Sequence, residues 1–126
     1  MAFDGLMVKA ITQELSTQII NGRIERVLQP DRDEIILQIR KPGETLRLLI
    51  SFHSELARIH LTTENKNNPV APPAFCMLLR KHIEGARIIR IEQIGFERII
   101  HLFMETYENI NKPTEKLLVF ELTGRH

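Results

Sequence analysis

The sequence lacks the features that mark disulfide-rich, metal-binding and membrane proteins. Its one cysteine, Cys76, excludes an internal disulfide and fits a reducing compartment. No Cys/His pair stands at zinc-ligand spacing, so we expect neither a metal nor a cofactor. The longest apolar run, residues 74–79, is far shorter than the roughly 18 residues of a membrane span. The N-terminus has no basic segment followed by an apolar one, so we predict a cytoplasmic protein without a membrane partner.

The chain has no large excess of positive or negative charge, and aromatic side chains are few. The 17 basic and 16 acidic side chains leave a net charge of +1 with neutral histidines. A nucleic-acid-binding role would therefore depend on a local patch rather than on overall charge. One tyrosine, six phenylalanines and no tryptophan argue against an extended base-stacking surface.

What is present is the composition of one globular domain. The chain has 126 residues, of which 43% are hydrophobic and 26% charged. Both fractions are near the averages of folded proteins, which excludes disordered and fibrous classes. A chain of this length can bury roughly two-thirds of the surface that its unfolded form exposes, enough for one core.

The first segment has the pattern of an amphipathic helix over residues 5–20. Its apolar side chains recur every four residues, at Met7, Ile11, Leu15 and Ile19. Asp4 stands at the N-cap position, and Phe3 and Val8 have the spacing of a hydrophobic staple. Asn21-Gly22 supplies the stop, with Gly22 expected in the left-handed conformation.

Four strands with short connections follow, because the apolar period changes to two. We predict them over residues 24–28, 34–40, 45–52 and 57–61. The first is expected to end at Gln29-Pro30-Asp31, and the Lys-Pro-Gly-Glu sequence at residues 41–44 has turn chemistry. The polar, proline-rich residues 62–73 are predicted to form a long surface loop.

A second helix and three strands complete the chain. Pro72-Pro73 opens the helix and Gly85 ends it, with an inner face expected at Phe75, Leu78, Leu79, His82 and Ile83. The strands are predicted over residues 87–94, 97–106 and 116–123, with a polar loop over 108–115. Two helices and seven mostly antiparallel strands indicate an α+β fold with a sandwich or flattened-barrel arrangement. The predicted core comprises Leu15, Leu37, Ile39, Leu48, Ile50, Leu78 and Leu118.

The sequence contains few motifs that are typical of catalytic sites. The six glycines are isolated, so there is no phosphate-binding loop, and the five histidines form no metalloprotease motif. His60 and His101 are expected to be exposed or hydrogen-bonded strand residues, and Cys76 a small buried apolar side chain. Asp31-Arg32-Asp33 could be a paired-carboxylate site, but a hairpin turn is the favoured interpretation.

Four segments resemble one known family. They are residues 1–6 (MAFDGL), 72–85 (PPAFCMLLRKHIEG), 91–100 (IEQIGFERII) and 121–126 (ELTGRH). The chain resembles the N-terminal NFACT domain of bacterial fibronectin-binding-protein-A-like, RqcH-type ribosome quality control factors, which are related to eukaryotic NEMF. The resemblance implies a single domain over residues 1–126, excised from a longer multidomain protein. It also implies a fold similar to the N-terminal domain of formamidopyrimidine-DNA glycosylases.

The resemblance implies a function in translation. Such factors bind the large ribosomal subunit carrying peptidyl-tRNA and recruit alanyl-tRNA, which adds an alanine tail to the stalled chain without mRNA. The family's Asp-Arg pair falls on Glu97 and Arg98, where the acid is one methylene longer, and its early acidic residue falls on Asp4. These three residues are the expected tRNA-binding residues.

The sequence also bears on two other functions, that of a DNA glycosylase and that of a surface adhesin. The glycosylases attack with an N-terminal proline amine beside a glutamate, and Ala2 and Phe3 stand after Met1 here, so we expect a non-enzymatic domain. The historical family name suggests a fibronectin-binding surface adhesin as the alternative, with fibronectin as its partner.

Overall fold

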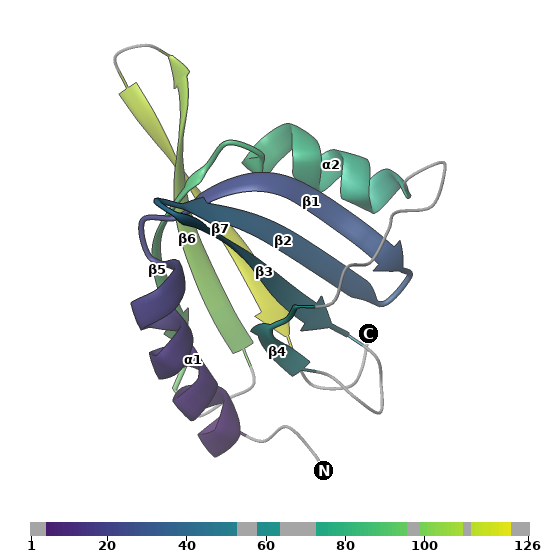
Figure 1. Cartoon of the computed structure of the whole chain (residues 1–126), viewed down its shortest axis with the longest axis vertical. Coiled ribbons are helices and arrows are strands. Elements are labelled where there is room, and N and C mark those ends of the chain that lie inside the picture. The colour runs from purple at the N-terminus through teal and green to yellow at the C-terminus, as the bar shows by residue number, and fades with distance from the viewer. Residues whose placement is uncertain (1–4, 53–57, 64–72, 96–98, 110–111, 122–126) are drawn as a thin grey trace.

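The computed structural model describes residues 5–52, 58–63, 73–95, 99–109 and 112–121. Two helices and seven strands follow the predicted order (Figure 1). Their bounds are α1 Gly5–Ile19, β1 Arg23–Asp31, β2 Glu34–Lys41, β3 Glu44–Ser51, β4 Arg58–Leu61, α2 Ala74–Ile83, β5 Arg87–Gln93, β6 Ile99–Asn109 and β7 Lys112–Glu121. Neither helix has the length and apolar character of a membrane span among the described residues.

All seven strands join one antiparallel sheet in the order β4-β3-β2-β1-β5-β6-β7. The α+β prediction is confirmed, although one open sheet takes the place of a sandwich of two. β1 pairs with β5 at a single position, Arg23 with Arg87, so the sheet divides into a β1–β4 half and a β5–β7 half. The hairpin of β6 and β7 projects beyond the rest of the molecule (Figure 1).

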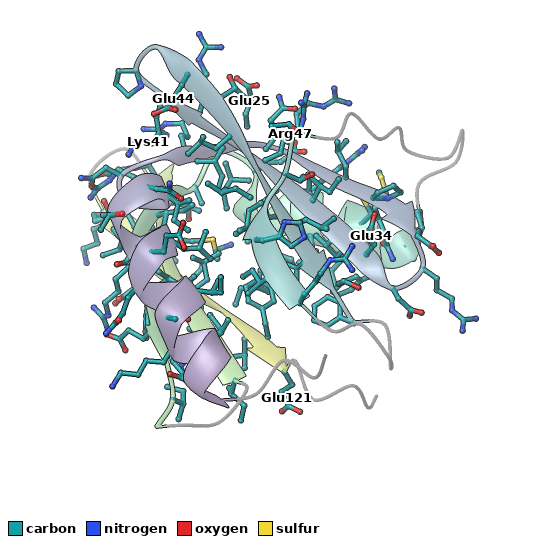
Figure 2. The ribbon with its side chains drawn as sticks, turned by 60° about the horizontal axis from the view of Figure 1, so that its bottom comes forward. Glu25, Glu34, Lys41, Glu44, Arg47 and Glu121 are labelled. Carbon is teal, nitrogen blue, oxygen red and sulfur yellow. The ribbon has the colours of Figure 1, made fainter. Side chains whose placement is uncertain are left out.

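Helix α1 buries the apolar stripe that its sequence predicts. Leu15 is 3% exposed and Ile19 is fully buried. The chain turns at Asn21, whose φ is 69°, so Asn21 rather than Gly22 takes the left-handed conformation. Gly22 is needed for a different reason: a Cβ there would collide with the Cγ2 of Ile39. The side chain of Lys41 donates to the carbonyl of Gln18 at 2.8 Å and so pairs one of the last carbonyls of the helix. Figure 2 shows Lys41 beside the end of α1.

The main core lies between α1 and the sheet and extends to α2. It contains the predicted Leu15, Leu37, Ile39, Leu48 and Ile50, with Leu118 packed against it, whereas the prediction for Leu78 is wrong. A second, small cluster on the other face of β1–β3 buries Leu28, Ile36 and Leu49. These strands are therefore buried on both faces at this point.

Helix α2 lies along the edge of β1 that β5 leaves unpaired (Figure 1). The backbone of Val27 meets three side chains there, those of Cys76 and Arg80 in α2 and that of Glu84, which caps the helix. Its N–H donates to Glu84 Oε2 at 3.2 Å, and its carbonyl accepts from Arg80 Nε at 3.0 Å and from Cys76 Sγ at 3.5 Å. Side chains thus replace the ladder hydrogen bonds that a neighbouring strand would supply.

The inner face predicted for α2 is only partly right. Cys76, Leu79 and Ile83 are buried, whereas Phe75, Leu78 and His82 point to solvent. The predicted face is wrong because the edge of β1 demands hydrogen-bonding side chains on the inner side. The ending at Gly85 is confirmed, since its φ is 87°.

Two strand boundaries also differ from the prediction. β1 continues to Asp31 through Pro30, which lies in the register shift between Leu28 and Asp31, where a proline can enter a strand. β6 and β7 extend through most of the predicted polar loop, as the pairing of Thr106 with Thr114 shows. Their polar side chains fit because this projecting hairpin end has no core to cover.

Candidate functional site

The three predicted site residues, Asp4, Glu97 and Arg98, lie outside the described residues. The predicted staple includes Phe3, which also lies outside the described residues, as does most of the predicted loop over 62–73. The described residues do define where residues 96–98 are attached. That attachment, and the groove beside it, form the candidate site.

Segment 96–98 joins two strands that are paired up to their last residues. Gln93, the end of β5, pairs with Ile100 in β6, and the N–H of Ile94 donates to the carbonyl of Ile99 at 3.0 Å. Gly95 has a φ of 59°, which its lack of a side chain permits. The predicted Glu-Arg pair therefore falls in the segment between two strands that pair with each other.

A groove of about 290 Å³ runs between α1 and the same end of β5. It is lined by Lys9, Thr12, Gln13, Ser16, Ile91, Glu92 and Gln93. The four α1 residues stand three or four apart, so they form one polar face of the helix. Sequence reasoning missed this face, although that spacing was visible as the side opposite the apolar stripe.

The groove is rich in hydrogen-bond donors. Lys9 brings an ammonium group, and Gln13 and Gln93 bring amides. The Ser16 hydroxyl already donates to the Gln13 carbonyl at 2.8 Å, and Thr12 is buried. The one carboxylate, Glu92, is paired with Arg90 at 2.9 Å. Such a set of donors suits a ligand that presents phosphate and hydroxyl oxygens.

An aromatic cluster lies on the outer face of β5 and β6, beside Glu92. The guanidinium of Arg90 stacks 3.9 Å from the ring centre of Phe103, and the His101 ring meets Phe103 edge-on at 6.0 Å. Arg90 thus connects the groove carboxylate to an aromatic ring. His101 is a partly exposed strand residue, as predicted.

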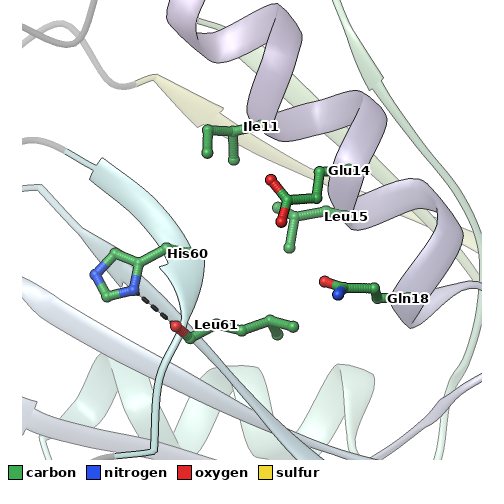
Figure 3. A pocket seen from close by; sticks show the side chains of 6 residues that line it. All are labelled: Ile11, Glu14, Leu15, Gln18, His60 and Leu61. Atoms are coloured by element: carbon green, nitrogen blue, oxygen red, sulfur yellow. Dashed lines mark hydrogen bonds between the residues drawn. The ribbon is translucent and has the colours of Figure 1, made fainter.

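A second hollow, of about 220 Å³, separates α1 from β4 (Figure 3). Glu14 and Gln18 reach toward it from α1, and Ile11, Leu15, His60 and Leu61 complete its lining. No lysine or arginine lines this hollow. Its acidic, apolar lining suits nucleic acid less well than the groove does.

His60 has a structural role at this edge. Arg58 Nε can only donate, so the 3.1 Å bond from it makes His60 Nε2 an acceptor. His60 Nδ1 therefore carries the proton and donates to the carbonyl of Leu61 at 2.9 Å. The prediction of a hydrogen-bonded strand histidine is confirmed.

The remaining candidates for chemistry are structural as well. Cys76 is fully buried, as predicted. Asp31 Oδ1 accepts the N–H of Arg32 at 2.6 Å, which confirms the hairpin turn. Within the described ranges, no three His, Cys, Asp or Glu side chains lie close enough together to hold a metal ion.

Known proteins similar to this chain share nearly its whole length. The family described as NFACT N-terminal and middle domains matches residues 4–126. "Rqc2 homolog RqcH" of Bacillus subtilis is 42% identical over 126 residues, which are 100% of this chain and 22% of the relative. Human "Ribosome quality control complex subunit NEMF" is 26% identical over 120 residues, covering 86% of this chain and 11% of the relative.

A solved structure agrees with these sequence matches. The N-terminal domain of fibronectin-binding protein PavA from Streptococcus pneumoniae superposes with a TM-score of 0.92 and 38% identity. The match covers 99% of this chain and 47% of that one. The chain spans about a fifth of the length of the bacterial relatives it matches. With the family matched over residues 4–126, this chain belongs to the NFACT family, which includes the ribosome quality control factors named RqcH and NEMF.

Proposed function

We propose that this domain binds tRNA within a longer ribosome quality control factor. That factor would associate with large ribosomal subunits that carry stalled peptidyl-tRNA. It would recruit alanyl-tRNA for tail addition without mRNA, in the cytoplasm. The domain itself would hold the tRNA and catalyse no reaction.

The observation that carries this proposal is the donor-rich groove beside the 96–98 connection. Most contacts between proteins and nucleic acids go to phosphate and sugar oxygens, and Lys9 and Gln13 bring a positive charge and an amide to the groove. The chain's net charge of +1 makes such a local arrangement necessary.

Arg98 is proposed as the principal contact. A guanidinium is planar and permanently charged, so it can bind a phosphate or a base edge through two parallel hydrogen bonds. Glu97 would orient a neighbouring basic group or accept from a tRNA hydroxyl. Asp4 stands one residue before α1, the helix that carries Lys9 and Gln13.

The test compares Arg98→Ala, Arg98→Lys and Lys9→Ala in the full-length protein. We expect Arg98→Ala to weaken tRNA binding roughly tenfold or more and to abolish alanine tailing, with Arg98→Lys intermediate. Lys9→Ala should weaken binding by a smaller factor and reduce its salt dependence. Arg40→Ala is the matched control, because Arg40 is exposed on β2, away from the groove.

Sedimentation with large subunits separates this role from general ribosome binding. Arg98→Ala should still co-sediment, because the other domains of the factor would supply most of that contact. Normal tailing by Arg98→Ala would refute the assignment. Loss of both tailing and co-sedimentation would instead indicate a general role in ribosome binding.

The isolated domain should bind tRNA weakly. A net charge of +1 leaves few phosphates to neutralise, and affinity should fall further as salt rises. Fluorescence anisotropy with labelled tRNA at two salt concentrations measures both effects. Tight binding that does not respond to salt would contradict the electrostatic basis of the proposal.

Fibronectin binding is the second candidate, because the solved PavA domain is named as a fibronectin-binding protein. The test is binding of the purified domain to immobilised fibronectin, with albumin as the control surface. Saturable binding that Arg98→Ala leaves unchanged would support a separate adhesive activity. Equal retention on albumin would eliminate this candidate.

A further inference from the structure

Helix α2 exposes three large apolar side chains in its first two turns. Phe75, Met77 and Leu78 are 49%, 51% and 52% exposed. Single exposed apolar residues are ordinary on protein surfaces, but Phe75 and Leu78 stand three residues apart and are neighbours on one face of the helix, so they form an apolar patch, with Met77 next to Leu78 along the chain. Phenylalanine and methionine are also enriched in protein–protein interfaces.

The C-terminal end of α2 borders a basic hollow of about 260 Å³. Arg23, Lys81, His82 and Tyr107 line it, together with Glu84, Gly85 and Thr106. The carboxylate of Glu84 is already engaged, since it accepts the Val27 N–H and lies 3.8 Å from Arg80 Nε. Arg23 and Lys81 bring two positive charges against the single carboxylate of Glu84, so the lining is net basic, and Arg23 also donates to the Gly85 carbonyl at 2.9 Å.

The apolar patch and the basic hollow form one continuous surface. Lys81 and His82 stand three and four residues after Leu78, so their side chains are neighbours on the helix. Figure 1 shows this end of α2 beside the β6–β7 hairpin, which contributes Tyr107. The surface thus changes from apolar to basic along the helix.

We propose that this surface docks a segment of another protein that carries apolar anchors followed by carboxylates. The anchors would cover Phe75 and Leu78, and the carboxylates would enter the hollow beside Arg23 and Lys81. Charge complementarity of this kind sets the orientation and the partner. The proposal goes beyond tRNA binding and does not depend on it, because β5, about 20 Å long, separates the two sites.

Other occupants fit the surface less well. RNA carries phosphates along its whole length, and the side chains of Phe75, Met77 and Leu78 offer no hydrogen-bond donors to them. A symmetric contact between two copies would bring the same surface of the second copy against Arg23 and Lys81, and that surface is itself net basic. A flat lipid surface would not reach into the hollow between α2 and β6.

The test uses two synthetic helical peptides with the same leucine and phenylalanine residues, one flanked by glutamates and the other by lysines. Each is titrated into the ¹⁵N-labelled 126-residue chain while amide shifts are recorded. We expect the glutamate peptide alone to shift the amides of Phe75, Leu78 and Lys81. Lys81→Glu should weaken binding of the glutamate peptide roughly tenfold and should allow the lysine peptide to bind.

Leu78→Gln and Leu117→Gln form the matched pair of variants. Leu117 is 48% exposed on β7, so both changes remove a similar exposed side chain. Only Leu78→Gln should weaken binding of the glutamate peptide, by roughly fivefold. Unfolding midpoints in urea confirm that both variants are folded, and Phe75→Ser serves as a second variant of the patch.

Several results would overturn the proposal. Equal binding of both peptides, shifts confined to β7, or no effect of Lys81→Glu would each do so. Tighter binding to these residues by a single-stranded RNA, by vesicles of anionic phospholipid, or by a second copy of the chain in sedimentation would assign the surface to that occupant instead.

Discussion

The two helices pack against different kinds of surface, and this difference decides which side chains each helix buries. α1 packs against a face of the sheet and buries the stripe that its apolar period predicts, with Leu15 and Ile19 at its centre. α2 packs along a strand edge and turns part of its predicted stripe, Phe75 and Leu78, to solvent. Both helices are amphipathic, yet only the orientation of α1 could be inferred from that property.

The difference arises from what each partner surface requires. A sheet face presents side chains, so the helix that covers it needs only apolar residues there. A strand edge presents unpaired N–H and C=O groups, whose burial without partners is costly. Arg80 of α2 and Glu84, the residue that caps the helix, therefore turn toward Val27, and Phe75 and Leu78 are left on the outer side.

The largest expected effect contrasts matched leucines of the two helices. Leu15→Ala should lower the free energy of unfolding by about 2–5 kcal/mol, because it leaves a cavity in the core. Leu78→Ala should change it by less than about 0.5–1 kcal/mol, since Leu78 is half exposed. Urea unfolding monitored by circular dichroism measures both. A loss of similar size in the two variants would mean that Leu78 is buried in solution.

The glycines that end the two helices provide the next contrast. Gly22→Ala should cost about 1–3 kcal/mol, because its methyl group would collide with Ile39 and approach the Ile19 carbonyl. Gly85→Ala meets no atom within 4 Å and should cost only the backbone strain of a positive φ, about 1 kcal/mol. Thermal unfolding of both variants tests this order, and a larger loss for Gly85→Ala would contradict it.

The edge contact of α2 should have a smaller but measurable effect. Glu84→Ala removes the acceptor of the Val27 N–H and should cost about 1–2 kcal/mol. Glu14→Ala on the exposed side of α1 is the control and should stay within about 0.5 kcal/mol. Hydrogen exchange of the Val27 amide should also accelerate in Glu84→Ala alone. An unchanged exchange rate would argue against this hydrogen bond.

The smallest expected effect concerns the residue that ties α1 to the sheet. Arg87 donates to Asn21 Oδ1 at 2.7 Å and to Glu105 Oε1 at 2.8 Å. The hydrogen bond from Arg87 lowers the pKa of Glu105 below its ordinary value of 4.5, and the same pair raises the pKa of Arg87. The carboxylate therefore stabilises the fold above pH 4.5, and this contribution disappears as pH falls through its lowered pKa.

Glu105→Gln tests that pH dependence. The variant should be less stable than the original at pH 7, and the difference should vanish at acidic pH below 4.5. The midpoints of urea unfolding at pH 7, 5 and 3 measure this difference in stability between the two proteins. A difference that stays constant across this range would show that the charge of Glu105 does not contribute.

The candidate site shows how far sequence patterns extend toward function. The resemblance of residues 91–100 to the family directs attention to Glu97 and Arg98, but it says nothing about the groove that adjoins them. Lys9 and Gln93 are more than eighty residues apart, and only the packing of α1 beside β5 makes them line one groove. Local patterns could not show that α1 would lie there, because no sequence period encodes the distance between two elements.

The sequence by itself determined the number, type and order of the elements. Helical and strand periods, the Pro42-Gly43 turn and the stop at Gly85 depend on neighbours within a few residues, so they could be recognised locally. Tertiary structure alone decided which side of α2 faces inward, that Gly22 must lack a side chain, and how far the β6–β7 hairpin extends. Each of these depends on backbone groups and side chains that are distant in the chain, and their hydrogen-bonding and packing demands arise only after the sheet has formed.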